Sequence, residues 1–213
     1  KTALVTGAAS GIGEAIANAL ARAGAYVYVA DLNAESGESV VAAISSEGLK
    51  AEFLLLDVSK REDCAAAAEN VTSKHGHLDI LINNAGIVRG KYFWEHDPER
   101  DIAATMNINA LAPMHITREF LPAMMTSQRQ SRIVTIASAA GLVSDPGMSI
   151  YAASKWAAIG FSDSLRLELK RTGHDHIAVT TVCPTFISTG MFACSVPVAV
   201  VPRPPRCPSW KIQ

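Results

Sequence analysis

The chain has 213 residues, of which 49% are hydrophobic and 18% charged, and its formal net charge at pH 7 is −1. This length and composition are typical of one globular domain with a sizeable core. The near-neutral charge gives no indication of a nucleic-acid-binding surface, and no run of residues approaches the ~20 apolar residues of a membrane-spanning helix.

The four cysteines have neither C-x-x-C nor zinc-site spacing, so we expect reduced thiols and no metal site. The two histidine pairs, His75 with His77 and His174 with His176, lack partner ligands at metal spacing, and we interpret all four as loop residues. No signal peptide is visible, so we expect a cytoplasmic protein. The chain starts directly in a predicted strand, and an upstream membrane anchor is compatible with it.

Apolar runs and helical periodicity alternate along the whole chain. Strands are predicted near residues 2–6, 26–30, 52–56, 78–83, 132–137 and 177–183, and helices near residues 12–23, 34–47, 60–75, 98–126 and 150–172. This alternation indicates right-handed βαβ units and a doubly wound parallel sheet with helices on both faces, which is a three-layer α/β fold. Ligands of such sheets bind outside the carboxyl ends of the strands.

The first predicted strand runs into a glycine-rich turn, Gly7-Ala-Ala-Ser-Gly11-Ile-Gly13, and then into an amphipathic helix. Glycines in such a turn allow positive φ angles and let backbone N–H groups approach a pyrophosphate at the helix N-terminus. The second predicted strand ends in Asp31, 24 positions after Gly7. A carboxylate at about this spacing binds the hydroxyls of an adenosine ribose. The pattern therefore predicts a dinucleotide site.

Tyr151 and Lys155 are four residues apart on a predicted helix, so their side chains share one face. A nearby positive charge favours phenolate over phenol, and we expect Lys155 to lower the pKa of Tyr151. Such a tyrosine can exchange a proton with an alcohol or ketone oxygen. Ser138 precedes Tyr151 by 13 residues in a turn of small residues, and its hydroxyl can hold the same oxygen.

These motifs together resemble the short-chain dehydrogenase/reductase family of the compact single-domain type. The glycine spacing T-G-x-x-x-G-x-G, Asp57-Val58, Asn83-Asn84-Ala85-Gly86, the serine and the Tyr–Lys pair occur in the family's order over residues 1 to about 193. The resemblance implies a Rossmann-type fold. It also implies hydride transfer between a nicotinamide cofactor and an alcohol or carbonyl group, with the tyrosine as acid and base.

The resemblance also implies a set of site residues. The implied catalytic residues are Asn109, Ser138, Tyr151 and Lys155. The implied cofactor-binding residues are Gly7, Ser10, Gly11, Ile12, Gly13, Asp31, Leu32, Asp57, Val58, Asn83, Ala85, Gly86, Tyr151, Lys155, Pro184, Ile187 and Thr189. Asn109 is chosen over Asn107 by counting back from Pro122-Ala123-Met124, and its implied role is to bend its helix and hold a water. Thr185 departs from the glycine that the family carries after Pro184.

Asp31, followed by Leu32 and with no Lys or Arg in the glycine turn, favours NAD(H) over NADP(H). The segments after the fifth and sixth strands are largely apolar, which favours a lipophilic secondary alcohol and its ketone or aldehyde. The expected pocket residues are Leu142, Val143, Pro146, Met148, Phe186, Met191 and Phe192. Two phrases, Leu121-Pro-Ala-Met124 and Thr189-Gly-Met-Phe192, are similar to the retinol and hydroxysteroid dehydrogenase branch.

Two other functions stay open. One is an NADPH-dependent 3-oxoacyl-carrier-protein reductase, against which Asp31 argues. The other is a catalytically impaired cofactor-binding protein, which the unusual C-terminus favours. The resemblance further implies a homodimer or homotetramer paired through the helices near 98–126 and 150–172.

Residues 1–193 are expected to form the domain and residues 194–213 an atypical tail. Five prolines after Val196 remove backbone donors. We therefore expect an extended or poorly ordered tail, no normal seventh strand, and an open substrate side of the pocket.

Overall fold

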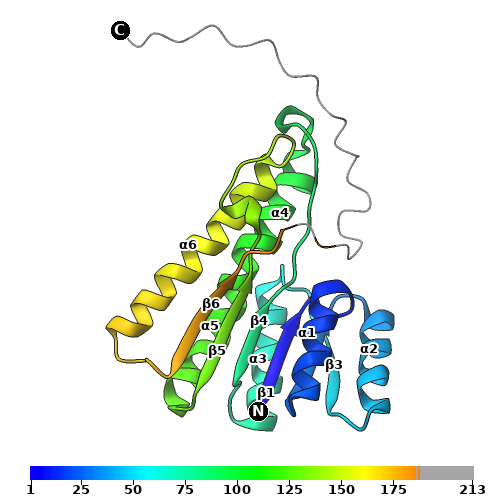
Figure 1. Ribbon diagram of the computed structural model, residues 1–213, viewed down its shortest axis with the longest axis vertical. Helices are drawn as coiled ribbons and strands as arrows, with labels where there is room; N and C mark the ends of the chain where they lie inside the picture. The colour runs from blue at the N-terminus through cyan, green and yellow to red at the C-terminus, as the bar shows by residue number, and fades with distance from the viewer. Residues whose placement is uncertain (186, 188–213) are drawn as a thin grey trace, which may run out of the picture.

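The protein is built around one parallel six-stranded sheet, seen in a computed structural model that describes residues 1–185 and 187. The strands are β1 (Thr2–Thr6), β2 (Tyr26–Asp31), β3 (Ala51–Leu55), β4 (Ile80–Asn83), β5 (Ser131–Ile136) and β6 (Ile177–Val182). Their order across the sheet is β3-β2-β1-β4-β5-β6 (Figure 1). The central strand β1 pairs Val5 with Val29 on one side and with Ile82 on the other. The predicted parallel α/β fold is confirmed.

Helices cover the sheet from both sides. They are α1 (Gly11–Arg22), α2 (Ala34–Ser46), α3 (Arg61–His75), α4 (Ala104–Met106), α5 (Ala112–Ser127) and α6 (Ser149–Arg171). One core cluster joins α1 and α2 to one face of the sheet, and a second joins α3, α5 and α6 to the other. Element boundaries otherwise lie within one or two residues of the predicted ones. No described helix is both long enough and apolar enough to cross a membrane.

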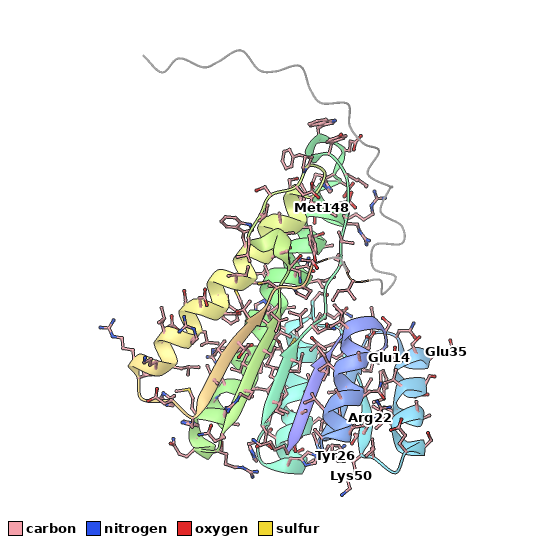
Figure 2. The ribbon with its side chains drawn as sticks, viewed as in Figure 1. Glu14, Arg22, Tyr26, Glu35, Lys50 and Met148 are labelled. Atoms are coloured by element: carbon pink, nitrogen blue, oxygen red, sulfur yellow. The ribbon has the colours of Figure 1, made fainter. Side chains whose placement is uncertain are left out.

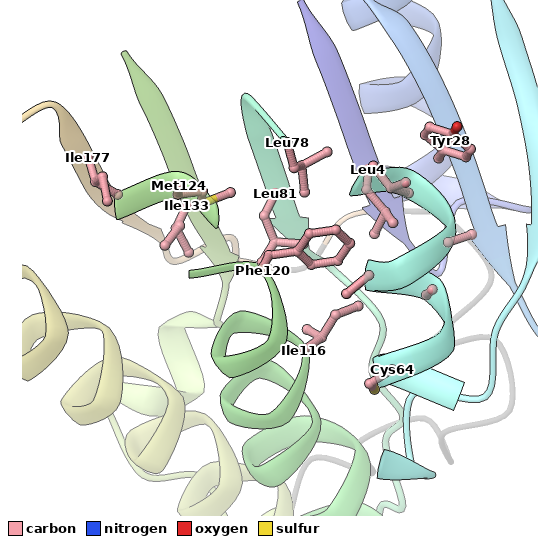
Figure 3. Packing of buried hydrophobic residues seen from close by; sticks show 14 of the residues in the cluster. Leu4, Tyr28, Cys64, Leu78, Leu81, Ile116, Phe120, Met124, Ile133 and Ile177 are labelled. Carbon is pink, nitrogen blue, oxygen red and sulfur yellow. The ribbon is translucent and has the colours of Figure 1, made fainter. Parts of the chain in front are cut away.

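The second cluster shows how α5 packs on the sheet (Figure 3). Ile116, Phe120 and Met124 recur at four-residue spacing on one face of α5, and all three are at most 1% exposed. They pack against Leu81 of β4 and Ile133 of β5 in the same cluster. Burying side chains of this size stabilises the fold by about 1.5–3 kcal/mol each.

The helix predicted over 98–126 is present, and its first part contains widened turns. Two π-helical segments, η2 (Pro98–Ala103) and η3 (Asn107–Leu111), lie on either side of α4, and α5 continues the helix directly from Ala112. The side chain of Asn109 leaves the helix to bond a neighbouring loop, and Pro113 in the first turn of α5 has no N–H to donate. Widened turns of this kind occur at functional sites.

The expectation that His75 is a loop residue is wrong, whereas His77 lies, as expected, in the loop between α3 and β4. His75 ends α3, and its Nε2 lies 3.1 Å from the hydroxyl of Tyr28. His77 is 8% exposed, with its Nε2 3.2 Å from Oδ1 of the buried Asp79. His75 therefore contacts a residue of β2, and His77 contacts the residue just before β4. The predictions for the tail, including the absence of a seventh strand, fall on residues outside those that the structure describes.

Candidate active site

A cavity of about 580 Å³ lies over the carboxyl ends of the strands. Its wall brings together most of the residues predicted to bind a cofactor. These are Gly7, Ser10, Gly11, Ile12, Asp31, Leu32, Asp57, Val58, Ala85, Gly86, Tyr151, Lys155, Pro184 and Ile187. Of the remaining three, Gly13 and Asn83 do not line it, and Thr189 lies outside the described residues.

The glycine turn forms one end of this cavity. Gly7 has φ +63° and lies so close to β4 that a Cβ atom would come within 2.9 Å of the Cα of Ala85. Gly13 packs under the turn, where a Cβ atom would collide with the carbonyl oxygen of Gly7. Gly13 is therefore needed for the close packing of the turn, and it does not line the cavity.

Helix α1 presents its N-terminus to the same end of the cavity. Ser10 is its N-cap residue and makes no side-chain capping bond, while Gly11 and Ile12 of the first turn line the cavity. Helix N-terminal N–H groups without intrahelical partners bind anions. The turn fits the diphosphate of a dinucleotide.

Two carboxylates stand at the ends of the neighbouring strands β2 and β3. Asp31 accepts hydrogen bonds from the backbone N–H groups of Ala9 and Asn33, each at 3.0 Å, so its side chain is fixed in position. Asp57 accepts bonds from the backbone and hydroxyl of Ser59 at 3.0 and 2.6 Å. The bond from the Ser59 hydroxyl holds the pKa of Asp57 below its ordinary value despite partial burial. Asp57 thus caps the turn before α3 as well as lining the cavity.

Asn83, the last residue of β4, and Asn84, which follows it, have side chains with different partners. Asn83 is 3% exposed and donates to the hydroxyl of Thr117 on α5 at 3.1 Å, away from the cavity. Asn84 lines the cavity and donates to the carbonyl oxygens of Thr6 and Gly7 at 2.9 and 3.0 Å. Asn84 was not predicted to line the cavity. Its position directly before two small residues at a strand end was the available signal.

Asn109 occupies a central position behind the cavity wall. Its Oδ1 accepts from the N–H of Ile87 at 2.8 Å, while its Nδ2 donates to the carbonyl of Ile87 at 2.8 Å and to Oγ of Ser154 at 3.0 Å. Asn107 is exposed, which supports the choice of Asn109. Asn109 thereby connects the loop after β4 to α6. Ser154, one residue before Lys155, was missed because a serine inside a helix carries no distinctive sequence signal.

Tyr151, Lys155 and Ser138 meet at the catalytic end of the cavity. Tyr151 and Lys155 are each 5% exposed, and Nζ of Lys155 lies 5.7 Å from the centre of the tyrosine ring. The ammonium donates to the carbonyl oxygen of Ile136 at the end of β5, at 2.9 Å. Ser138 follows β5 and accepts from the N–H of Ala140 at 3.1 Å, so its hydroxyl hydrogen is available to another acceptor.

The pKa expectation for Tyr151 is wrong in its direction. Burial raises the pKa of Tyr151, and the Ser138 hydroxyl only partly offsets this effect. Burial also lowers the pKa of Lys155 to about 8. Removal from water disfavours the charged form of each group, and this cost exceeds the attraction that sequence spacing alone suggests.

A second cavity of about 330 Å³ shares Ser138, Tyr151 and Thr185 with the first. Two expected pocket residues, Val143 and Met148, line it; Met148 is at the end of the molecule opposite Tyr26 and Lys50 (Figure 2). Leu142 and Pro146 do not line it, and Phe186, Met191 and Phe192 lie outside the described residues. The wall also includes three polar residues that were not predicted for this pocket: Ser144, Asp145 and Thr185.

Comparison with known proteins agrees with this geometry. The family described as short chain dehydrogenase matches residues 1–197. Retinol dehydrogenase 10-B of Danio rerio is 36% identical over 99% of the chain and 68% of its own length. Estradiol 17-beta-dehydrogenase 11 of Pongo abelii is 39% identical over 88% of the chain and 62% of its own length. The chain therefore spans about two thirds of the length of these relatives.

Solved structures show the same fold. A short chain dehydrogenase/reductase from Burkholderia phymatum in complex with NAD is 32% identical with a TM-score of 0.87, covering 91% of this chain and 68% of that one. A metagenomic short-chain oxidoreductase in complex with NADP is 34% identical with a TM-score of 0.81, covering 88% and 83%. The family match, the parallel sheet and the Ser–Tyr–Lys group lead to one conclusion: this chain belongs to the short-chain dehydrogenase family of oxidoreductases, which act on CH–OH groups with NAD or NADP.

Proposed function

We propose that the protein is an NAD(H)-dependent oxidoreductase that interconverts a lipophilic alcohol and the corresponding carbonyl compound, a ketone from a secondary alcohol or an aldehyde from a primary one. The observation that carries the proposal is the position of Tyr151 and Ser138 on the wall shared by the two cavities. One cavity has the glycine turn and fixed carboxylates that suit a dinucleotide, and the other has the volume for a small organic substrate.

The chain's own residues supply proton transfer and orientation. In alcohol oxidation, the phenolate of Tyr151 accepts the hydroxyl proton, and in carbonyl reduction the phenol returns it. The hydroxyl of Ser138 donates to the substrate oxygen and holds it beside the tyrosine. The ammonium of Lys155 favours the phenolate by its charge, although burial still leaves the pKa of Tyr151 above its ordinary value. The nicotinamide cofactor supplies the hydride acceptor or donor.

Asn109 and Ser154 act on this group through the backbone. Asn109 fixes both polar groups of Ile87, a residue of the cavity wall, while bonding Ser154 on the helix that carries Tyr151 and Lys155. The Ser154 hydroxyl in turn donates to the carbonyl of Tyr151 at 2.7 Å. These bonds keep the wall and the catalytic helix at a fixed separation.

The preference for NAD(H) is supported by Asp31. Its carboxylate is fixed by two backbone bonds, and the neighbouring wall residue Leu32 offers no positive charge. A 2′-phosphate on the adenosine ribose would meet this carboxylate, whereas free hydroxyls would donate to it. We expect catalytic efficiency with NAD to exceed that with NADP by at least about tenfold, and Asp31→Asn to reduce the difference.

The experiment is a turnover assay on retinol, estradiol and simple secondary alcohols, each with NAD and with NADP, using Tyr151→Phe as the control. Cofactor reduction that depends on Tyr151 and favours NAD supports the proposal. Activity confined to NADPH and carrier-protein-linked 3-oxoacyl thioesters would instead identify the reductase. Tight NADH binding without turnover of any substrate would identify a cofactor-binding protein.

A further inference from the structure

Arg89 is a charged residue of the cavity wall that the proposed function does not use. Among the described residues, the wall of the larger cavity holds four charged side chains, those of Asp31, Asp57, Arg89 and Lys155. The two carboxylates stand at the ends of β2 and β3, beside the glycine turn. Lys155 is at the catalytic end, and Arg89 is on the loop that follows β4; Arg89 lines the larger cavity and not the smaller one.

The loop that carries Arg89 begins beside Lys155. A Cβ atom on Gly86 would lie 3.5 Å from Nζ of Lys155. Ile87, the next residue, is held on both its N–H and its carbonyl by Asn109. Arg89 follows two residues later. The loop then returns to the substrate side, where the N–H of Lys91 donates to the carbonyl of Gly147 at 2.9 Å.

The guanidinium of Arg89 has unused hydrogen-bonding capacity. Its Nε lies 3.9 Å from Oδ1 of Asp101, which is an ion pair but too long for a hydrogen bond. Asp101 already accepts from Lys91 at 2.7 Å, from the N–H of Asp97 at 3.1 Å and from Arg100 at 3.3 Å. No hydrogen bond joins the Arg89 side chain to another residue within 1–185, and 45% of that side chain is exposed.

Asp101 therefore lies beside the Arg89 guanidinium and attracts it by charge, without accepting a hydrogen bond from it. The hydrogen bond from Lys91 and that from the backbone of Asp97 hold the pKa of Asp101 well below its ordinary value, so it stays charged. A guanidinium offers five N–H donors in a planar fork that matches a carboxylate or phosphate. A wall position with an undersatisfied guanidinium suits an anionic ligand.

We infer that Arg89 binds an anionic group of the substrate, so that the substrate is a lipophilic alcohol or ketone carrying a carboxylate or phosphate a few bonds from the reacting carbon. The inference rests on the proposed function for the identity of the reacting group. The other anion in the site is the cofactor diphosphate. The N–H groups of the turn at Ser10–Ile12 suit that diphosphate at the opposite end of the cavity.

The test compares a matched acid and ester in four proteins. The probes are 3-hydroxyoctanoate and its methyl ester with NAD, and the proteins are the wild type, Arg89→Gln, Arg89→Lys and Arg100→Gln. Arg100 contacts the same aspartate but does not line the cavity, so its variant is the control. We expect the wild type to favour the acid, Arg89→Gln to lower kcat/KM about tenfold for the acid alone, Arg89→Lys to recover part of the loss, and Arg100→Gln to behave as the wild type.

Two results would overturn the inference. An equal loss for acid and ester would make Arg89 a structural residue of the loop. A weaker affinity of Arg89→Gln for NADH, measured by fluorescence titration, would assign the guanidinium to the cofactor.

A binding measurement separates this inference from the proposed function. Octanoate and octanamide are titrated against the protein with NADH, with no turnover required. Octanoate binding that weakens about tenfold in Arg89→Gln, with octanamide unaffected, supports the anion site even if no alcohol is oxidised. Octanoate binding that ignores the substitution refutes the anion site even in an active enzyme.

Discussion

Tyr151 gives the most direct test at the scale of single residues. Tyr151→Phe keeps the buried ring and removes only the ionisable hydroxyl, so the fold and the cofactor cavity should persist. General acid–base catalysis contributes typically about 10²–10⁴-fold. We expect a loss of that size in kcat, with NADH affinity nearly unchanged, measured by steady-state kinetics and fluorescence titration. Lys155→Ala should damage both quantities. Near-native turnover by the Phe variant would assign the proton to another group.

Lys155 should reveal its burial through the pH dependence of stability. Its pKa is about 8 in the folded chain against an ordinary value of 10.5. Between these values the unfolded chain binds more protons, so this group makes the protein more stable as pH rises from about 8 to about 10.5. The resulting increase in the free energy of unfolding is at most about 3 kcal/mol. Below pH 8 the buried ammonium of Lys155 lowers the stability of the folded chain.

Lys155→Met supplies the comparison, because it keeps the length of the side chain and removes the charge. Urea denaturation from pH 7 to 10.5 should show a rise in the free energy of unfolding for the wild type that the variant lacks. Other titrating groups contribute equally to both proteins. Parallel curves for the two proteins would mean that the ammonium is solvated in the folded chain.

At the scale of elements, Asn84 joins the turn after β1 to the end of β4. Its amide donates to the carbonyls of Thr6 and Gly7, and the Thr6 hydroxyl accepts from the N–H groups of Asn84 and Ala85 at 3.0 Å. Asn84→Ala leaves two carbonyls without this donor. We expect a loss of about 1–3 kcal/mol in the free energy of unfolding and weaker NADH binding. Asn107→Ala, on an exposed side chain, is the control and should change neither.

The elements also show which features sequence reasoning can reach. Strands and helices were predictable because apolar periodicity reflects burial on a sheet that is covered on both faces. The π-helical segments within the helix over 98–126 were not, because they depend on which partners Asn109 finds in the folded chain. The partners of the Asn83 and Asn84 side chains were not predictable for the same reason, since the sequence at a strand end does not reveal which side chain meets the cavity. The pKa of Tyr151 was misjudged because burial is not visible in residue spacing.

At the scale of the whole molecule, α6 carries more apolar residues than its buried face uses. Ala158 and Leu165 are buried in the subunit, whereas Trp156 and Leu167 are 54% and 56% exposed. Trp156 and Leu167 are 11 positions apart, which is close to three helical turns, so they share one outward face of α6. Leu111, just before α5, is also 41% exposed. Exposed apolar side chains on a long helix are suited to association with a second copy.

We therefore expect a homodimer or homotetramer paired through α5 and α6, with Trp156 near the centre of the contact. Trp156→Glu places a charge in that contact and should shift the protein to monomer at micromolar concentration, measured by light scattering. Leu55→Glu is the matched control: Leu55 is 63% exposed at the end of β3, on the edge of the sheet opposite β6. It should leave the assembly unchanged. A wild type that is already monomeric, or two variants with equal effects, would show that the exposed face of α6 is not the interface.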